Sequence, residues 1–292
     1  MADATARVLF DLLPDYERWQ RRRHLAPGTI KRRRQLLTRF NRWCQGEGLS
    51  IVEVVTEDIE RWLDHLGQGA KGISPQTRHN YTRVLSSFYG WAVRAEVVER
   101  DPTLEVVRPR LPRALPRPMD PADLVRAMDA SDDRKAAMLA LTAFAGLRCK
   151  EIAGLQIEDV DFKHKRILVA HGKGNKERVV PLHPEVERRL RRVAPEHGYV
   201  FHRTWPYVTP EPIKPETVSS FVSHVYRDMG IKASAHRGRH LFLTAVYEEC
   251  QDIRVVQELA GHASPQTTAR YAAWSQKRAE DAVAALSFRE DR

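Results

Sequence analysis

In the N-terminal third of the chain, apolar side chains recur at spacings of three and four residues, which places them on one face of a helix. Three segments follow this pattern, at residues 26–44, 55–67 and 74–92. Their apolar positions are Ile30, Leu37, Phe40 and Cys44, then Ile59, Trp62, Leu63 and Leu66, and finally Leu85, Phe88 and Trp91. The pattern predicts a compact bundle of about four helices.

The residues at the starts of these segments predict where the helices begin. Ser74 is a good N-cap residue, and Pro75 suits the first helical position because its φ is already helical. Pro27 occupies the same place in the first segment. In the middle segment we expect Thr56 to be the cap, since acidic residues follow it in the first turn.

The helical pattern stops between Asp101 and Pro121, where the chain holds six prolines. Each proline fixes its own φ and biases the preceding residue away from helix, so no regular element is expected there. We therefore predict a helical domain at residues 1–105, a linker rich in proline and arginine at 106–119, and a second domain at 120–292. The arginines of the linker could follow a phosphate backbone or simply be solvated.

The second half of the chain mixes two periodicities. Residues 121–147 and the chain after Pro215 have helical spacing, and two short β-branched runs, RILVA and RVVPL, lie between them. These runs flank the segment HGKGNKE, whose glycines and asparagine are turn residues, so they predict an antiparallel hairpin with Lys173 at its tip. The expected fold class is mainly α with a small antiparallel β-sheet.

The composition limits the classes of function. The chain has 292 residues with 48 Lys and Arg against 38 Asp and Glu, and this net charge of +10 favours a polyanionic partner, either nucleic acid or an acidic membrane surface. No apolar run approaches the roughly 20 residues that span a bilayer. The apolar part of the N-terminus is too short for a signal peptide, so we expect a cytoplasmic protein with no membrane partner.

The three cysteines, Cys44, Cys149 and Cys250, form no CxxC pair and leave an odd number. This spacing argues against a disulfide framework and against a thiolate metal site. We interpret all three as reduced residues that mostly serve packing.

Seven basic residues lie close together around the start of the first predicted helix. Cations at a helix N-terminus oppose its macrodipole, at a cost of about a few tenths of a kcal/mol each. DNA phosphates would compensate this cost, although a solvated basic face would also account for the cluster. The candidate DNA contacts are these seven residues and two from the linker, namely Arg21, Arg22, Arg23, Lys31, Arg32, Arg33, Arg34, Arg110 and Arg113.

Four stretches in the second half carry polar residues that suit phosphate chemistry. AGLRCKEI contains Arg148, HGKGNKERVVPL contains Lys173, SAHRGRH contains His236 and Arg239, and LAGHASPQTTARYAAW contains His262 and Tyr271. Taken singly, each of these residues is more often a surface or packing residue. His236 and His240 also have the spacing of two zinc ligands on a helix, but the arginines between them repel a dication.

Together, and in this order, the stretches resemble the tyrosine recombinase family, also called the phage integrase family, and most closely its Xer-like and short integrase members. The family order is Arg, Lys, His-x-x-Arg, His and Tyr, which is met by Arg148, Lys173, His236, Arg239, His262 and Tyr271. The resemblance covers essentially the whole second domain. It implies an N-terminal helical bundle of the SAM-like core-binding type and a C-terminal domain with the tyrosine recombinase catalytic fold.

The sequence departs from the usual family pattern at two positions. Gly238 stands where an apolar residue is common, and Ala260 stands where leucine is common. Glycine in a helix interior costs about 0.5–1 kcal/mol relative to alanine, so we expect the helix to start later or to bend at Gly238.

The resemblance implies a covalent mechanism that needs no metal, ATP or other cofactor. Tyr271 would attack a DNA phosphodiester to give a 3′-phosphotyrosyl link and a free 5′-hydroxyl, and the hydroxyl of a second strand would reverse the step. His236 is the candidate base. Arg148 and Arg239 would stabilise the charge that gathers on the non-bridging oxygens in the transition state.

The remaining polar residues of the motifs have supporting roles in this interpretation. Lys173 would protonate the leaving 5′-oxygen, and His262 would hydrogen-bond the phosphate. Glu151 can lie on the same helix face as Arg148 and buttress it, or it can be a plain surface carboxylate. His240 would pack or hydrogen-bond locally.

The resemblance also implies the partners. They are double-stranded DNA with specific recombination sites and other copies of the chain, as a dimer on one site and a tetramer in the synapse. An accessory or directionality factor is a further candidate. The amphipathic tail at residues 275–288 would dock onto a neighbouring protomer or onto its own domain. We expect the protein to be cytoplasmic and associated with the nucleoid.

Three other interpretations are open at this point. A metallohydrolase using His236, His240 and His262 lacks the glutamate of an H-E-x-x-H helix and any acidic cluster. A DNA-binding regulator that has lost catalysis is supported only by the basic charge and the helices. A type IB topoisomerase-like relaxing enzyme shares the chemistry, but the separate N-terminal bundle and the tail favour an assembly that recombines DNA.

Overall fold

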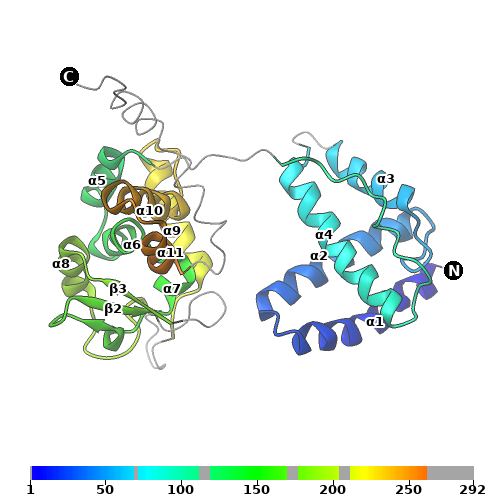
Figure 1. Ribbon diagram of the computed structural model, residues 1–292, viewed down its shortest axis with the longest axis horizontal. Helices are drawn as coiled ribbons and strands as arrows, with labels where there is room; N and C mark the ends of the chain where they lie inside the picture. The colour runs from blue at the N-terminus through cyan, green and yellow to red at the C-terminus, as the bar shows by residue number, and fades with distance from the viewer. Residues whose placement is uncertain (1, 69–71, 112–118, 170–176, 204–210, 262–292) are drawn as a thin grey trace, which may run out of the picture. The chain divides into compact units, whose positions relative to one another are not determined.

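The computed structural model describes residues 2–68, 72–111, 119–169, 177–203 and 211–261 (Figure 1). Their contacts divide the chain into two compact units, Met1–Arg113 and Ala114–Arg292. In the described residues, no helix is both long enough and apolar enough to cross a membrane.

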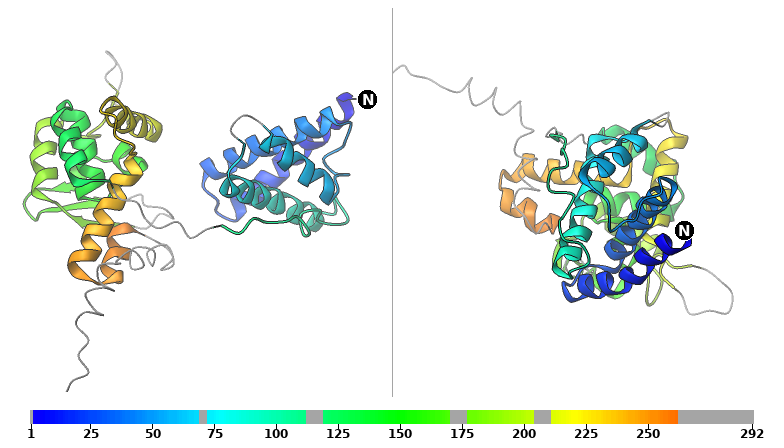
Figure 2. Two further views of the ribbon diagram at one scale, coloured as in Figure 1. Left: turned by 90° about the horizontal axis from the view of Figure 1, so that it is seen from above. Right: turned by 90° about the vertical axis from the view of Figure 1, so that its right-hand side faces the viewer.

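The first unit contains four described helices, α1 (Ala2–Arg22), α2 (Pro27–Gly46), α3 (Thr56–Gly67) and α4 (Pro75–Arg94). The four helices form one bundle (Figures 1 and 2). Its core is rich in aromatic rings. The ring centroids of Phe40 and Trp62 are 4.8 Å apart, and those of Tyr16 and Phe88 are 5.4 Å apart in an edge-to-face arrangement. The predicted helical bundle is therefore confirmed, and α1 adds a helix that none of the three sequence segments covers.

The helix starts of this unit follow the predicted caps in one case and not in another. At α4, Ser74 is the N-cap as predicted, and its Oγ accepts a hydrogen bond of 3.1 Å from the Thr77 N–H. At α3, the prediction of Thr56 as the cap is wrong, because the N-cap is Val55, whose N–H donates to Asp58. The Thr56 hydroxyl instead donates to the carbonyl of Pro102, 2.8 Å away.

The proline-rich stretch after α4 forms no helix or strand in residues 101–111 and 119–120, and its last proline, Pro121, begins the next helix. It packs on the first unit, since Val106 is buried in that unit's core and Arg108 donates to Ser86. Met119 is buried in the core of the second unit. The stretch is thus anchored to the first unit at least as far as Arg108.

The second unit is built around α6, whose side chains are buried along almost its entire length. The helices α5, α8, α9 and α10 pack against it (Figures 1 and 2). The bounds of the helices are Pro121–Asp129 for α5, Asp133–Phe144 for α6, Cys149–Ala153 for α7, Ile157–Asp159 for the 3₁₀ helix η1, Pro184–Val193 for α8, Pro215–Asp228 for α9, Ala235–Cys250 for α10 and Ile253–Ala260 for α11.

A small antiparallel sheet lies beside these helices, with strand order β1 (Val160–Asp161), β2 (Arg166–Val169) and β3 (Arg178–Pro181). The RILVA and RVVPL runs thus pair as predicted, with Ile167 opposite Val180. These two side chains are buried in the core of the unit. The fold is mainly helical with a small antiparallel sheet, as the sequence pattern indicated.

Gly238 lies in the first turn of α10, which starts at Ala235 and not later. A Cβ added at Gly238 would lie 2.7 Å from Oγ1 and 3.3 Å from Cβ of Thr142, which belongs to α6. Only glycine therefore lets α10 approach α6 this closely. The glycine is explained by helix packing.

The three cysteines are all free thiols, but they do not share one environment. Cys44 is buried in the first core and Cys149 is half-buried beside the second. Cys250, at the end of α10, is exposed, so its interpretation as a packing residue is wrong.

Candidate active site

Arg148 is held at the start of α7 by a turn that depends on Gly146. Gly146 has a φ of +61°, and a Cβ added to it would overlap the ring of Phe242 on α10. The segment AGLR can therefore turn against α10 only because glycine stands there. Arg148 is the N-cap residue of α7, and its side chain is 25% exposed.

Two of the contacts of Arg148 go to Glu151, one turn further along. The backbone N–H of Arg148 donates to Oε2 of Glu151 at 2.9 Å, and its Nη1 donates to Oε1 at 2.8 Å. Nη2 donates to the carbonyl oxygen of Ala260 at 2.8 Å. The predicted pairing of Arg148 and Glu151 is therefore present, and it is linked to the end of α11.

Glu151 is a buried carboxylate, with a side chain only 2% exposed, and not a surface residue. Besides Arg148 it binds Arg178 of β3, whose Nη1 and Nη2 donate to its two oxygens at 2.9 and 2.7 Å. Burial raises the pKa of Glu151, but the hydrogen bonds and charges of Arg178 and Arg148 outweigh it and bring the pKa down to about 2. Glu151 is ionised and holds two guanidinium groups together.

Arg239 reaches the same place from α10. Its side chain is buried and donates to the carbonyl oxygens of Gly146 and Ala260. Arg148 and Arg239 thus meet at the last turn of α11. Carbonyl groups at a helix C-terminus carry partial negative charge, which stabilises cations there. Gly261 ends the helix in the left-handed conformation, with a φ of +56°.

The histidines of α10 lie beside Arg239 along the helix. The ring of His236 stands edge-to-face on that of His240, with centroids 4.6 Å apart. His236 is exposed and His240 is half-buried. The local packing predicted for His240 is present.

No described group of three or more His, Cys, Asp and Glu side chains is arranged to hold a metal ion. The one deeply buried carboxylate of this site, Glu151, is occupied by two arginines. The other charged side chains described at this point are those of Arg148, Arg178 and Arg239, and guanidinium groups are anion-binding groups.

Comparison with known proteins decides the family. The chain matches the phage integrase family over residues 117–278 and the N-terminal SAM-like domain of phage integrases over residues 16–96. The chain belongs to the phage integrase family. It is accordingly a DNA breaking and rejoining enzyme of the tyrosine recombinase class.

Named relatives agree with this assignment. The recombinase is 33% identical over 263 residues to tyrosine recombinase XerC 2 of Ralstonia nicotianae. The aligned region covers 83% of this chain and 76% of the relative. It is 31% identical over 272 residues to tyrosine recombinase XerD of Pseudomonas aeruginosa, and this aligned region covers 88% of this chain and 90% of the relative.

Two solved structures share the fold. The Tn1549 transposon integrase in complex with transposon right end DNA has a TM-score of 0.71 at 18% identity, covering 94% of this chain and 99% of its own. The XerH recombinase bound to a palindromic difH substrate has a TM-score of 0.71 at 20% identity, covering 90% of this chain and 81% of its own.

Half of the six motif positions of the recombinase lie outside the described residues. These are Lys173, His262 and Tyr271, and the tail at residues 275–288 and Arg113 also lie outside. Lys173 lies in the sequence between two described strands, because β2 ends at Val169 and β3 starts at Arg178.

Arg178 is the contact residue that the motif analysis missed. The β3 strand alternates, with Val180 buried and Val179 exposed, so Arg178 shares the inward face with Val180. An arginine at an inward-facing strand position needs a buried anion. That alternation was the signal in the sequence for a carboxylate partner.

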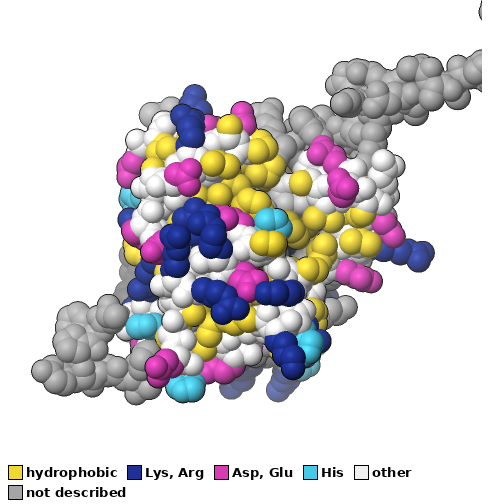
Figure 3. Space-filling model, turned by 90° about the vertical axis from the view of Figure 1, so that its left-hand side faces the viewer, with side chains coloured by type: hydrophobic (Ala, Val, Ile, Leu, Met, Phe, Trp, Pro, Cys, Tyr) yellow, Lys and Arg dark blue, Asp and Glu magenta, His cyan; other side chains and the backbone are white. Residues whose placement is uncertain are grey.

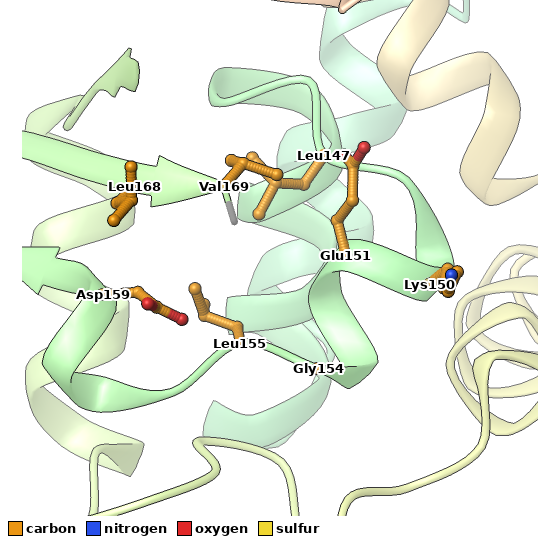
Figure 4. A pocket seen from close by; sticks show the side chains of 8 residues that line it. All are labelled: Leu147, Lys150, Glu151, Gly154, Leu155, Asp159, Leu168 and Val169. Carbon is orange, nitrogen blue, oxygen red and sulfur yellow. The ribbon is translucent and has the colours of Figure 1, made fainter. Parts of the chain in front are cut away.

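A pocket lies beside Glu151 between α7 and the sheet of the recombinase (Figure 4). Its wall includes Leu155 and Leu168, and its charged residues besides Glu151 are Lys150 and Asp159. The Glu151 carboxylate points away from that of Asp159 (Figure 4). Glu151 is therefore turned to the arginines and not to the opposite wall.

In the first unit, several of the candidate DNA contacts are engaged within the protein. Arg21 and Arg34 both donate to Glu17, whose side chain is 4% exposed, at 3.0 and 2.5 Å. The hydrogen bond from Arg34 lowers the pKa of Glu17. Arg33 donates to Ser87 at 2.7 Å.

The other described candidates are all exposed. The guanidinium of Arg23 lies 4.7 Å from the centroid of the Trp19 ring, a cation–π contact. Arg22, Lys31, Arg32 and Arg110 are exposed. The cluster therefore divides into arginines that contact groups of their own unit, although Arg21 and Arg34 are also more than half exposed, and basic side chains for which no such contact is described.

Exposed arginines in the second unit are not all available to an anion. Figure 3, seen from the side of Figure 1 where α5 and α8 lie, shows Lys and Arg interspersed with Asp and Glu. The arginines of α8 form ion pairs with N–O distances of 2.6, 2.9 and 3.1 Å, namely Arg188–Glu185, Arg191–Glu187 and Arg192–Asp133. This face carries little excess charge for a phosphate backbone.

Proposed function

We propose that the recombinase cuts and rejoins double-stranded DNA at specific sites through a 3′-phosphotyrosyl intermediate on Tyr271, and that Arg148 and Arg239 bind the scissile phosphate. The observation that carries this proposal is the shared contact of the two arginines with the carbonyl of Ala260. Two guanidinium groups anchored at one point suit the two non-bridging oxygens of one phosphodiester.

The proposed step is a transesterification. The Tyr271 oxygen bonds to phosphorus while the bond from phosphorus to the 5′-oxygen breaks, and the tyrosine proton passes to His236. Lys173 supplies the proton that the leaving 5′-oxygen needs, and His262 hydrogen-bonds the phosphate. The 5′-hydroxyl of a second strand then reverses the step, so the energy of the bond is retained without ATP.

The arginines contribute most where the charge grows. In the pentacoordinate transition state the non-bridging oxygens gain negative charge, and groups already fixed in place stabilise it without reorganisation. Arg239 is buried between α10 and α11, and Arg148 is fixed by Glu151. Such fixed positions are what electrostatic catalysis requires.

DNA is the proposed partner of both domains, with a helical DNA-binding domain at residues 1–105 and a catalytic domain at 120–292. Support comes from the net charge of +10 and from the exposed basic residues of the first unit. Arg22, Lys31, Arg32 and Arg110 are the better candidates for phosphate contacts. Arg21, Arg33 and Arg34 already bind groups of their own unit.

We further propose the assembly of the family type, a dimer on one site and a tetramer in the synapse, with the tail at residues 275–288 joining protomers. An accessory or directionality factor would act on this assembly. The protein would work in the cytoplasm, on nucleoid DNA.

The test is to trap the covalent intermediate. The protein is incubated with a pool of duplexes that carry a randomised segment and a nick beside it, so that the short cleaved fragment diffuses away and the adduct persists. Wild type should form adducts, and sequencing of the attached DNA would identify the site. Tyr271→Phe should bind the recovered duplex with the same affinity and form no adduct. An adduct formed by Tyr271→Phe would overturn the assignment of the nucleophile.

A further inference from the structure

Arg178, the first residue of β3, joins three elements that surround the candidate site. Its side chain is 8% exposed. Nε donates to the carbonyl oxygen of Leu259 in α11 at 2.9 Å, while Nη1 and Nη2 hold the carboxylate of Glu151 in α7. One guanidinium group thus ties β3 to α7 and to the end of α11.

Each of these contacts lies next to a residue of the proposed chemistry. Glu151 binds the Arg148 guanidinium, and Leu259 precedes Ala260, whose carbonyl accepts from Arg148 and Arg239. Gly261, the residue after Ala260, packs directly on Arg178. A Cβ added at Gly261 would lie 3.1 Å from Nη1 and 3.2 Å from Cδ of Arg178.

The charges around Glu151 explain why the contact matters. The described charged groups that bind its carboxylate are Arg148 and Arg178, and Lys150 and Asp159 line the neighbouring pocket. Arg178 makes two of the three side-chain hydrogen bonds to this carboxylate. If Arg178 were removed, Arg148 would be the one cation left among the described side chains that bind the buried Glu151 carboxylate.

We propose that Arg178 is a positioning residue for cleavage: it holds Glu151 and the end of α11 so that the Arg148 guanidinium stays where the phosphate binds. The inference rests on the proposed function. Arg178 does not touch the DNA in this proposal and acts through Glu151 and α11. An arginine is needed because a lysine could replace the charge but not three donors in one plane.

The first experiment measures single-turnover adduct formation against pH, on the nicked duplex recovered by trapping, for wild type and Arg178→Met. A misplaced reacting group costs about ten- to a hundredfold in rate, so we expect a loss of that size at neutral pH with unchanged affinity for the duplex. Loss of Arg178 also removes two of the three side-chain hydrogen bonds that keep Glu151 ionised, so the rate should begin to fall at a higher pH than in wild type. Arg178→Lys should restore part of the pH profile.

Two further variants make the result specific. In the double variant Arg178→Met with Glu151→Gln, position 151 carries no carboxylate to titrate, so the added acid limb should disappear. Arg188→Met is the matched control, because Arg188 also grips a glutamate with two nitrogens but is half exposed on α8. It should leave both the rate and the pH profile unchanged.

The outcomes separate this inference from the proposed function. An unchanged rate and pH profile in Arg178→Met would overturn the positioning role, and so would a loss of rate that follows the melting temperature with the pH profile unmoved. Absence of an adduct with wild type would contradict the proposed function instead. In that case the ¹³C-carboxyl resonance of Glu151 still tests the arrangement, since its pKa should be higher in Arg178→Met and Arg178→Lys than in wild type. An equal pKa would overturn it.

Discussion

Arg148 and Arg239 come from different helical segments of the second unit and donate to the same carbonyl oxygen, that of Ala260. The relationship makes each arginine dependent on the end of α11 as well as on its own segment. It also brings the two guanidinium groups to one carbonyl oxygen, while Glu151 binds Arg148 through both its backbone N–H and its Nη1.

The first prediction concerns the replacement of Arg148 by lysine. Arg148→Lys keeps the positive charge but loses the fork that binds Glu151 and Ala260 together. We expect adduct formation to slow by about a hundredfold or more, equivalent to about 2.7–4 kcal/mol, with little change in affinity for the duplex. Single-turnover cleavage and a binding titration on the same duplex measure the two quantities. Equal losses in rate and in affinity would assign Arg148 to binding alone.

The second prediction concerns the pH dependence of unfolding. Glu151 has a pKa of about 2 in the folded protein against an ordinary 4.5, so the unfolded chain binds more protons between these values. The stabilisation from Glu151 is therefore complete above about pH 4.5 and is lost as the pH falls towards 2. The shift corresponds to about 3 kcal/mol of unfolding free energy.

Denaturant unfolding of Glu151→Gln measures this contribution. The variant should be less stable than wild type at neutral pH by about 3–5 kcal/mol, because the buried side chain of Arg178 and the partly buried one of Arg148 lose their counter-charge. The difference should shrink as the pH falls from about 4.5 towards 2. Glu196→Gln, at an exposed position, should follow wild type throughout. A difference that stays constant with pH would show that Glu151 does not titrate as described.

The third prediction concerns helix packing at Gly238. Gly238→Ala places a methyl group against Thr142, and overpacking of this kind costs about 1–3 kcal/mol. Adding Thr142→Ala should recover part of the loss, because it removes the nearer of the two clashing atoms. Gly28→Ala in α2 is the control, since nothing lies within 4 Å of an added Cβ there. Additive effects in the double variant would exclude direct contact between the two positions.

The fourth prediction separates the two kinds of basic residue in the first unit. Arg32→Ala should lower the slope of log affinity against log salt by about 1, because an exposed cation that neutralises a phosphate releases about one counterion. Arg33→Ala should leave that slope unchanged and lower the unfolding free energy by about 1 kcal/mol, because it loses the bond to Ser87. Fluorescence anisotropy over a salt series and denaturant unfolding measure the two effects. If the salt slope fell in Arg33→Ala and not in Arg32→Ala, Arg33 and not Arg32 would be the residue that contacts a phosphate.

The sequence predicts helices, strands and the order of motifs because these depend on local spacing. The stripe through Leu37 and Phe40 and the cap at Ser74 are properties of neighbouring residues, and the structure has both. The Thr56 cap failed because its hydroxyl finds a tertiary acceptor, Pro102, which no local rule anticipates. Local chemistry therefore identified the element and missed its exact start.

The site shows the same division. Sequence order placed Arg148 and Arg239 in one motif, and the spacing of three placed Glu151 beside Arg148. The burial of Glu151 and its second partner, Arg178, depend on β3 packing beside α7, which is a tertiary relationship. Gly238 was unexplained for the same reason, because the side chain that requires it belongs to α6.

The different environments of the three cysteines leave one of them, Cys250, accessible to thiol-reactive labels. Burial raises the pKa of the Cys44 thiol to about 12 and also raises that of Cys149, so both thiolates are scarce at neutral pH. Cys250 is exposed at the end of α10. A maleimide dye should therefore label Cys250 first in the unmodified chain. A fluorophore there would sit one short helix before His262 in the sequence, and a change in its emission on titration with duplex DNA would report binding.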